Sequence, residues 1–167
     1  MRIRPETAAD RAAVRAVNVA AFDTALEADL VETLRGKGVP LISLVAEVAG
    51  EVVGHILFSP VSLEGHSHLS VMGLGPMAVA PQHQRKGVGT ALVSEGLDAA
   101  RRVGCHAVVV IGHAHYYPRF GFVPASRHAL RCEYGVPDDV FLVIELEEAA
   151  LRAASGLIRY DEAFGTV

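Results

Sequence analysis

The spacing of apolar residues predicts two helices near the start of the chain. Residues 2–5 read as a short first strand that Pro5 ends. Apolar positions then recur every three or four residues over 7–21, and again from residue 23 or 24 to about 35. Thr7 or Asp10 is the expected cap of the first of these helices. The chain therefore opens with a strand and two amphipathic helices.

The middle of the chain changes to a strand pattern. Two runs rich in β-branched residues, 41–50 and 51–61, meet at Gly50 and predict a hairpin. A third apolar run, 69–81, ends at Pro81. A helix is expected over about 87–103, where Leu92, Val93 and Ala100 share one face with two glycines.

The last third contains two strong strands. Residues 105–113 form an apolar run of the buried type, and 140–146 form another. Between them, residues 114–122 read as a turn or short helix that Pro118 interrupts. The tail, 147–167, has no clear pattern. The predicted order is β-αα-βββ-α-β-α-β.

This order predicts the α/β class and a single domain over residues 1–167. A strand, a helix and a strand around Gly87 imply a crossover and local parallel pairing. The hairpin implies antiparallel neighbours. The expected fold is a mixed sheet with helices on both faces.

Composition and charge narrow the function. Hydrophobic residues make up 51% of the 167 residues, which argues against disorder. A net charge of −4 argues against a general nucleic-acid binder. The first residues have no apolar signal core and no run could span a membrane, so a cytoplasmic protein is expected. Cys105 and Cys132 follow no metal or redox spacing.

The stretch QHQRKGVGTALVSEGL, residues 82–97, is the clearest candidate for chemistry. It places Arg85, Lys86 and two glycines where a helix begins. A helix start has unpaired N–H groups and a partial positive charge, and glycine lets the backbone approach a ligand. These features favour a phosphate site. Alternatively, Gly89 serves tight packing of the helix on the sheet. Neither the P-loop nor the dinucleotide fingerprint is present.

The surrounding residues resemble those of a known superfamily. MAVAPQHQRKGVGTAL is similar to the acyl-CoA motif of GCN5-related N-acetyltransferases (GNAT), a strand followed by Q/R-x-x-G-x-G/A and a helix. Downstream, YYPRFGF places Tyr117 four residues before Gly121, as in many members. The same combination resembles a bacterial subgroup of predicted N-acetyltransferases. The resemblance implies the GNAT fold, with a mostly antiparallel sheet of about six or seven strands.

The resemblance also implies acetyl-CoA as co-substrate. Backbone N–H groups of the loop would hold the pyrophosphate, and the strand before the loop would pair with the pantetheine arm. These roles carry over to Gln84, Arg85, Lys86, Gly87, Val88, Gly89 and Thr90 for the loop, and to Met77, Ala78 and Val79 for the strand. No metal is expected.

Acyl transfer needs stabilisation of the carbonyl oxygen and of the leaving thiolate. By analogy, the backbone N–H of Val79 is the candidate donor to the oxygen. A phenol with a pKa of about 10 is protonated at neutral pH, so Tyr117 can act as general acid. The alternative is that Tyr117 simply packs in the core.

The sequence leaves the identity of the general base open. Some relatives carry a Glu on the strand before the loop, and residues 71–79 contain no carboxylate. Candidates for the acceptor site are Asp23, Glu27, His55, Ser59 and His113. For Asp23 and Glu27 the alternative is an ordinary solvated helix face.

Three functions are compatible with these residues. The first is transfer of an acetyl group to a primary amine of a small molecule in a ternary complex. The second is acetylation of a protein N-terminus or lysine, and the third is a non-catalytic CoA-binding or sensing module. No nucleic-acid or membrane partner is expected, and dimers among relatives make a homodimer a further expectation by analogy.

Overall fold

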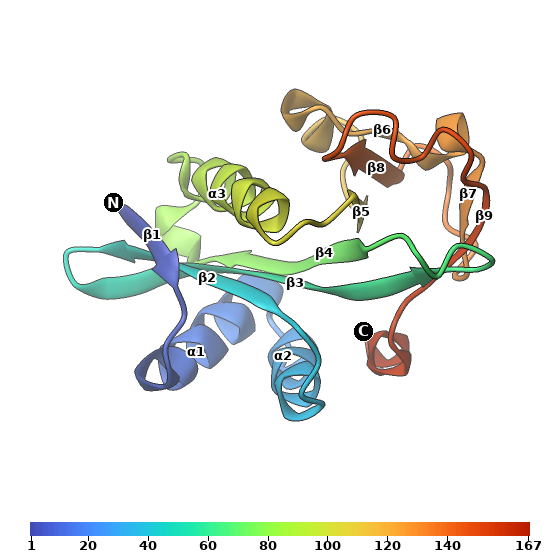
Figure 1. Ribbon diagram of the computed structural model, residues 1–167. Coiled ribbons are helices and arrows are strands. Elements are labelled where there is room, and N and C mark those ends of the chain that lie inside the picture. The colour runs from blue at the N-terminus through green and yellow to red at the C-terminus, as the bar shows by residue number, and fades with distance from the viewer. The chain divides into compact units, whose positions relative to one another are not determined.

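The computed structural model describes residues 1–167 and groups them into two compact units (Figure 1). The first unit comprises residues 1–59, 75–96 and 162–167, and the second comprises 60–74 and 97–161. Strands β3 (Glu51–Leu63) and β4 (Val71–Val79) and helix α3 (Val88–Arg102) contribute to both. None of the helices is long and apolar enough to cross a membrane.

An antiparallel meander forms the strand layer of the first unit. β1 (Arg2–Pro5) pairs with β2 (Ile42–Val48), and β2 pairs with β3, with Val45 opposite His55. The connection from β2 to β3 has positive φ angles at Ala49 and Gly50, 53° and 81°. Two positive φ angles define the tight hairpin turn that matches strand twist. The predicted hairpin is confirmed.

Helices α1 (Arg11–Phe22) and α2 (Leu26–Gly36) follow β1, as expected. A 3-10 turn, η1 (Ala8–Asp10), precedes α1. Asp10 Oδ2 accepts hydrogen bonds from the Thr7 N–H at 2.7 Å and the Thr7 hydroxyl at 3.0 Å, which fixes this start. The second helix begins at residue 26 rather than 23 or 24, because Asp23 adopts a left-handed conformation that ends α1.

The two faces of β3 pack against different helices. Leu57 belongs to a buried cluster with Val14 of α1 and Leu34 of α2. On the opposite face, a Cβ added to Gly54 would lie 3.0 Å from Leu92 Cδ1 in α3. Helices therefore cover both faces of the sheet in the first unit, as predicted, and Figure 1 shows α1 and α2 on one side of these strands and α3 on the other.

The second unit combines parallel and antiparallel pairs. The start of β4 pairs in parallel with β5 (Ala107–Ile111), with Met72 opposite Val108. This confirms the parallel pairing expected around Gly87. β5 pairs antiparallel with β8 (Phe141–Glu145), which also pairs with β6 (Val123–Pro124).

Three short strands were not predicted. Besides β6, they are β7 (Leu130–Cys132) and β9 (Gly156–Arg159), which pair in parallel with each other. β9 also pairs with the end of β3, so part of the ambiguous tail is a strand. Seven strands follow one another in the order β1-β2-β3-β4-β5-β8-β6, as expected, and β7 and β9 lie off this path and bring the total to nine. Most pairs are antiparallel, which confirms the fold class.

The helix expected between the last two strong strands is replaced by two 3-10 turns. These are η3 (Tyr117–Phe120) and η4 (Ala125–His128), and another 3-10 turn, η5 (Glu162–Thr166), lies near the end of the chain. Pro118 has no N–H to donate, and Gly121 adopts a left-handed conformation with φ of 102°. A longer helix therefore cannot form over residues 114–122.

Candidate active site

The loop before α3 has the backbone geometry of an anion site. Arg85 and Gly87 both have positive φ angles, 59° and 86°. Residues 84–87 are exposed, and a Cβ built on Gly87 would meet no atom within 4 Å. Alternation between right- and left-handed backbone turns successive N–H groups toward one concave side, where an anion can bind. The side chains of Arg85 and Lys86 add two positive charges to this loop.

A side-chain hydrogen bond connects this loop to the end of β4. Gln84 Nε2 donates to the carbonyl oxygen of Val79 at 3.0 Å. After the loop, the Ala91 N–H donates to the Gly87 carbonyl at 3.1 Å, as in the first turn of a helix. N–H groups that precede it belong to the first turn, which has no acceptor within the helix. The structure thus brings the expected phosphate loop and Val79 together in one unit.

Met77, Ala78 and Val79 form the last three residues of β4. Ala78 is buried, whereas Met77 and Val79 are half-buried. The next residue, Ala80, donates its N–H to the Val53 carbonyl of β3 at 2.8 Å. The end of β4 is therefore fixed beside β3, on one side, and tied to the loop through Gln84.

Tyr117, the candidate general acid, lies in the second unit at the start of η3. Its ring packs edge-on against Tyr116 and Phe122, with centroids 5.0 and 5.6 Å away. A Cβ built on Gly112 would lie 2.3 Å from Cε2 of this ring, closer than real Cβ atoms approach. Gly112 directly follows β5, so the absence of a side chain there lets the ring lie against the strand end.

The surroundings of Tyr117 keep its phenol protonated. The residue is 7% exposed, and burial raises the pKa of Tyr117 above its usual range, with a smaller contribution from Tyr116. A protonated, positioned phenol is the state that a general acid requires.

His55 is not placed at a surface. It is fully buried, and its ring nitrogens lie 3.2 Å from Asn18 Nδ2 and 2.9 Å from Ser43 Oγ. Burial, with a smaller contribution from Arg35, lowers the pKa of His55 to about 3. The imidazole is therefore neutral near pH 7. Ser59, on the same face of β3, is also fully buried.

The other acceptor-site candidates are more accessible. Asp23 is exposed at the left-handed residue that ends α1, and Glu27 accepts a hydrogen bond from the Thr24 hydroxyl at 3.0 Å. His113 is exposed, and its carbonyl accepts the N–H groups of Tyr116 and Tyr117. No group of three His, Cys, Asp or Glu side chains is arranged to hold a metal ion.

A row of polar residues, fully buried at Asn18 and His55 and half-buried at Ser43 and Glu6, was not anticipated from the sequence. It runs from Asn18 of α1 through His55 and Ser43 to Glu6, whose carboxylate also pairs with Arg35. The residues are far apart in the chain and share no motif. The one sequence signal for this row is the strand alternation, which places His55 on a buried face of β3 where a polar side chain needs partners.

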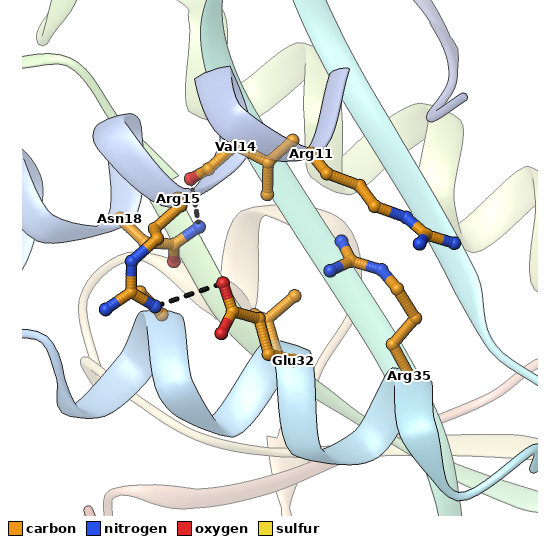
Figure 2. Close-up of a pocket in the computed structure, with 8 residues that line it drawn as sticks. Arg11, Val14, Arg15, Asn18, Glu32 and Arg35 are labelled. Atoms are coloured by element: carbon orange, nitrogen blue, oxygen red, sulfur yellow. Dashed lines mark hydrogen bonds and ion pairs between the residues drawn. The ribbon is translucent and has the colours of Figure 1, made fainter. Parts of the chain in front are cut away.

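A shallow depression without enclosed room for a water molecule lies between α1 and α2 (Figure 2). Its lining includes Arg11, Arg15, Glu32, Arg35 and Asn18. Figure 2 shows the ion pair between Arg15 and Glu32, 3.1 Å long, and the Asn18 side chain bonded to the Val14 carbonyl at 3.0 Å.

Comparison with known proteins agrees with the fold. Residues 12–122 match the model of the acetyltransferase (GNAT) family. The chain is 38% identical to the N-acetyltransferase YhbS of Escherichia coli over 165 residues, 98% of each chain. The crystal structure of Escherichia coli YhbS in complex with CoA superposes with a TM-score of 0.93 at 37% identity, covering 98% of this chain and 91% of that one.

A second solved structure is also similar over nearly the whole chain. It is a GNAT family acetyltransferase from Brucella melitensis in complex with acetyl-CoA, with a TM-score of 0.80 and 35% identity, covering 98% of this chain and 97% of that one. The chain belongs to the GNAT family of acetyltransferases. It is an N-acetyltransferase, as its relatives are named.

Proposed function

We propose that this protein transfers the acetyl group of acetyl-CoA to a primary amine of a small molecule. The observation that carries the proposal is the exposed left-handed turn at Arg85 and Gly87, with open space over Gly87 at the start of α3. It fits a pyrophosphate, because N–H groups, two basic side chains and the helix start converge there. Two relatives of similar fold hold CoA or acetyl-CoA, which supports the same co-substrate here.

Val79 supplies the candidate donor for the reacting carbonyl. Its N–H lies at the end of β4, which is tied to the loop by Gln84. A fixed N–H aimed at the thioester oxygen would stabilise the charge that develops when the amine attacks. The nitrogen–carbon bond forms, the carbon–sulfur bond breaks, and the thiolate leaves with the electron pair.

Tyr117 supplies the proton for that thiolate. Its phenol is protonated over the physiological pH range, since burial raises its pKa. Gly112 leaves the space that its ring occupies. β4 contains no carboxylate that could take the proton of the attacking amine. Amine deprotonation is therefore assigned to water, and the neutral amine is the reacting species.

The test is acetyl transfer to a panel of primary amines, with free-thiol release as the rate and mass spectrometry of the product as the proof. Peptides with free N-termini and lysines serve as the comparison set. The proposal is supported if small amines are acetylated faster than peptides. Exclusive acetylation of peptides would replace it with a protein acetyltransferase, and binding of acetyl-CoA without turnover of any amine would point to a sensing module.

A further inference from the structure

The loop before α3 begins and ends at two consecutive residues of β3, and all of these residues belong to the first unit. Ala80, at the start of the loop, donates its N–H to the Val53 carbonyl at 2.8 Å. Val88, the first residue of α3, lies against Gly54, because a Cβ built on Gly54 would be 3.0 Å from Val88 Cγ1. Residues 81–87 therefore leave β3 and return to it within one dipeptide.

The first half of this loop is fixed by its own hydrogen bonds. The His83 N–H donates to the Ala80 carbonyl at 2.8 Å, and the Gln84 side chain donates to the Val79 carbonyl. Residues 85–87 lead directly into α3. The position of this second half therefore follows the position of the helix start.

Lack of space, and not an unusual backbone conformation, requires a glycine at position 54. Gly54 is not among the residues with a positive φ angle, so an alanine could adopt its backbone conformation. The added methyl group would meet atoms on three sides: Val88 Cγ1 and Leu92 Cδ1 at 3.0 Å, and Ala46 Cβ at 3.3 Å. A glycine inside a strand often marks such a close approach.

The neighbour that has to give way is the first turn of α3. Ala46 is the partner of Gly54 in the β2–β3 pairing and is held there by the sheet. Val88 has one strongly preferred rotamer in a helix, so its Cγ1 atom moves with the backbone. Leu92 is fully buried, and close packing resists a change of its rotamer. A methyl group at position 54 would therefore displace the helix start by a few tenths of an ångström.

We propose that Gly54 is a positioning residue for the co-substrate, because it lets the start of α3 lie at the depth where the N–H groups of the loop and first turn meet the pyrophosphate of acetyl-CoA. The N–H groups of Val88 and Gly89 have no acceptor within the helix, and they move with this turn. Hydrogen bonds to phosphate depend on the distance and angle of each donor. The inference rests on the proposed function, since it takes the pyrophosphate to bind at residues 84–90.

A second glycine in the same helix–strand contact offers a matched control. A Cβ built on Gly96 of α3 would lie 2.3 Å from Cε1 of Phe58 in β3, which is a more severe clash than the one at Gly54. Gly96 follows Val88 by eight residues, and eight residues of helix span about 12 Å. Both glycines bring α3 close to β3, but Gly54 does so at the end that carries the loop.

The test is calorimetric titration of the wild type, Gly54→Ala and Gly96→Ala with acetyl-CoA, together with their melting temperatures. We expect Gly54→Ala to raise the Kd about three- to tenfold, because misplaced donors lose binding energy steeply. Gly96→Ala should lower the melting temperature more and change the Kd less than about twofold. Dephospho-CoA keeps the pyrophosphate, so Gly54→Ala should weaken its binding by the same factor.

A double variant tests whether the contact itself is responsible. Gly54→Ala combined with Val88→Ala lacks the Cγ1 atom that the new methyl group meets, and the freed space lets Leu92 move aside. Its Kd should return to within about twofold of the value for Val88→Ala alone. This comparison also decides the matter if Gly96→Ala does not fold.

Equal Kd values for the wild type and Gly54→Ala would overturn the inference. So would a Kd that follows the melting temperature across the two glycine variants, a double variant that regains no affinity, or a loss confined to acetyl-CoA and absent with dephospho-CoA. Failure of the folded wild type to bind acetyl-CoA would instead contradict the proposed function, so the two failures are distinguishable.

Discussion

The ring of Tyr117 lies directly against the backbone of Gly112, at the end of β5. A Cβ built on Gly112 would sit 2.3 Å from Cε2 and 2.8 Å from Cδ2 of the ring. The two positions are five residues apart, and the turn between them is closed by the His113 carbonyl, which accepts two N–H groups. The glycine therefore determines where the phenol can lie, which makes it a positioning residue for the proposed acid.

Gly112→Ala should displace the Tyr117 ring. The methyl group cannot share the space, so we expect kcat for acetyl transfer to fall about tenfold or more, whereas the Kd for acetyl-CoA should change little. The matched control is Gly36→Ala, because a Cβ at Gly36 meets no atom within 4 Å. Equal kcat values for the two variants would show that the contact does not position the acid.

Tyr117→Phe should remove the proton donor and keep the packing of the ring. We expect kcat to fall about 10²–10⁴-fold, the range for loss of general acid catalysis, with an unchanged melting temperature. Tyr116→Phe is the neighbouring control and should keep most of the activity. Full activity of Tyr117→Phe, measured by free-thiol release, would assign Tyr117 to the core alone.

Gly87→Glu should weaken binding of acetyl-CoA. The side chain would enter the open space over Gly87 and bring a negative charge toward the pyrophosphate. We expect the Kd to rise at least tenfold in calorimetry. Gly104→Glu controls for backbone strain, since Gly104 also has a positive φ angle of 80° and open space around it. A similar Kd in both variants would contradict the placement of the pyrophosphate.

His55 should make the stability of the protein depend on pH. Mainly because of burial, the pKa of His55 is about 3 in the folded protein, compared with the ordinary value of 6.5 that applies to the unfolded chain. Between these values the unfolded chain binds a proton that the folded chain does not, so stability falls as the pH is lowered from about 6.5 toward 3. Between pH 7 and 5 the loss is about 2 kcal/mol.

The measurement is urea unfolding of the wild type and of His55→Gln at pH 7, 6 and 5. The variant loses the hydrogen bonds of the imidazole, so it should be less stable than the wild type at pH 7. Because glutamine does not titrate, the difference in unfolding free energy should narrow by about 2 kcal/mol at pH 5. His68→Gln, at an exposed histidine, should follow the wild type. A difference that stays constant with pH would show that burial does not hold His55 neutral.

The sequence predicts elements that are long or that carry strong local signals. Alternation and the turn at Gly50 give the hairpin, and the periodic positions over 87–103 give α3, observed at Val88–Arg102. Strands of two or three residues, such as β6 and β7, have too few positions to show alternation. Pairing with distant strands defines them, and no local pattern encodes that pairing.

The candidate site also has one part that a local sequence motif reveals and one part that only tertiary packing brings together. The loop from Gln84 to Thr90 and the end of β4 lie close together along the chain, so a motif can reveal them. The row from Asn18 to Glu6 brings together residues from α1, β3, β2 and the segment before η1. His55 and Asn18 are 37 positions apart, and only the packing of α1 on β3 brings them into contact. The sequence suggested His55 as an acceptor-site candidate, and the structure shows that its imidazole is fully buried.

The most direct measurement is calorimetric titration of the purified protein with acetyl-CoA, using dephospho-CoA and inorganic phosphate as comparisons. We expect binding of acetyl-CoA in the micromolar range, loss of at least tenfold in affinity for Gly87→Glu, and no detectable binding of phosphate alone. Absence of acetyl-CoA binding to the folded wild type would contradict the central claim, because neither the loop nor Tyr117 would then have a co-substrate to act on.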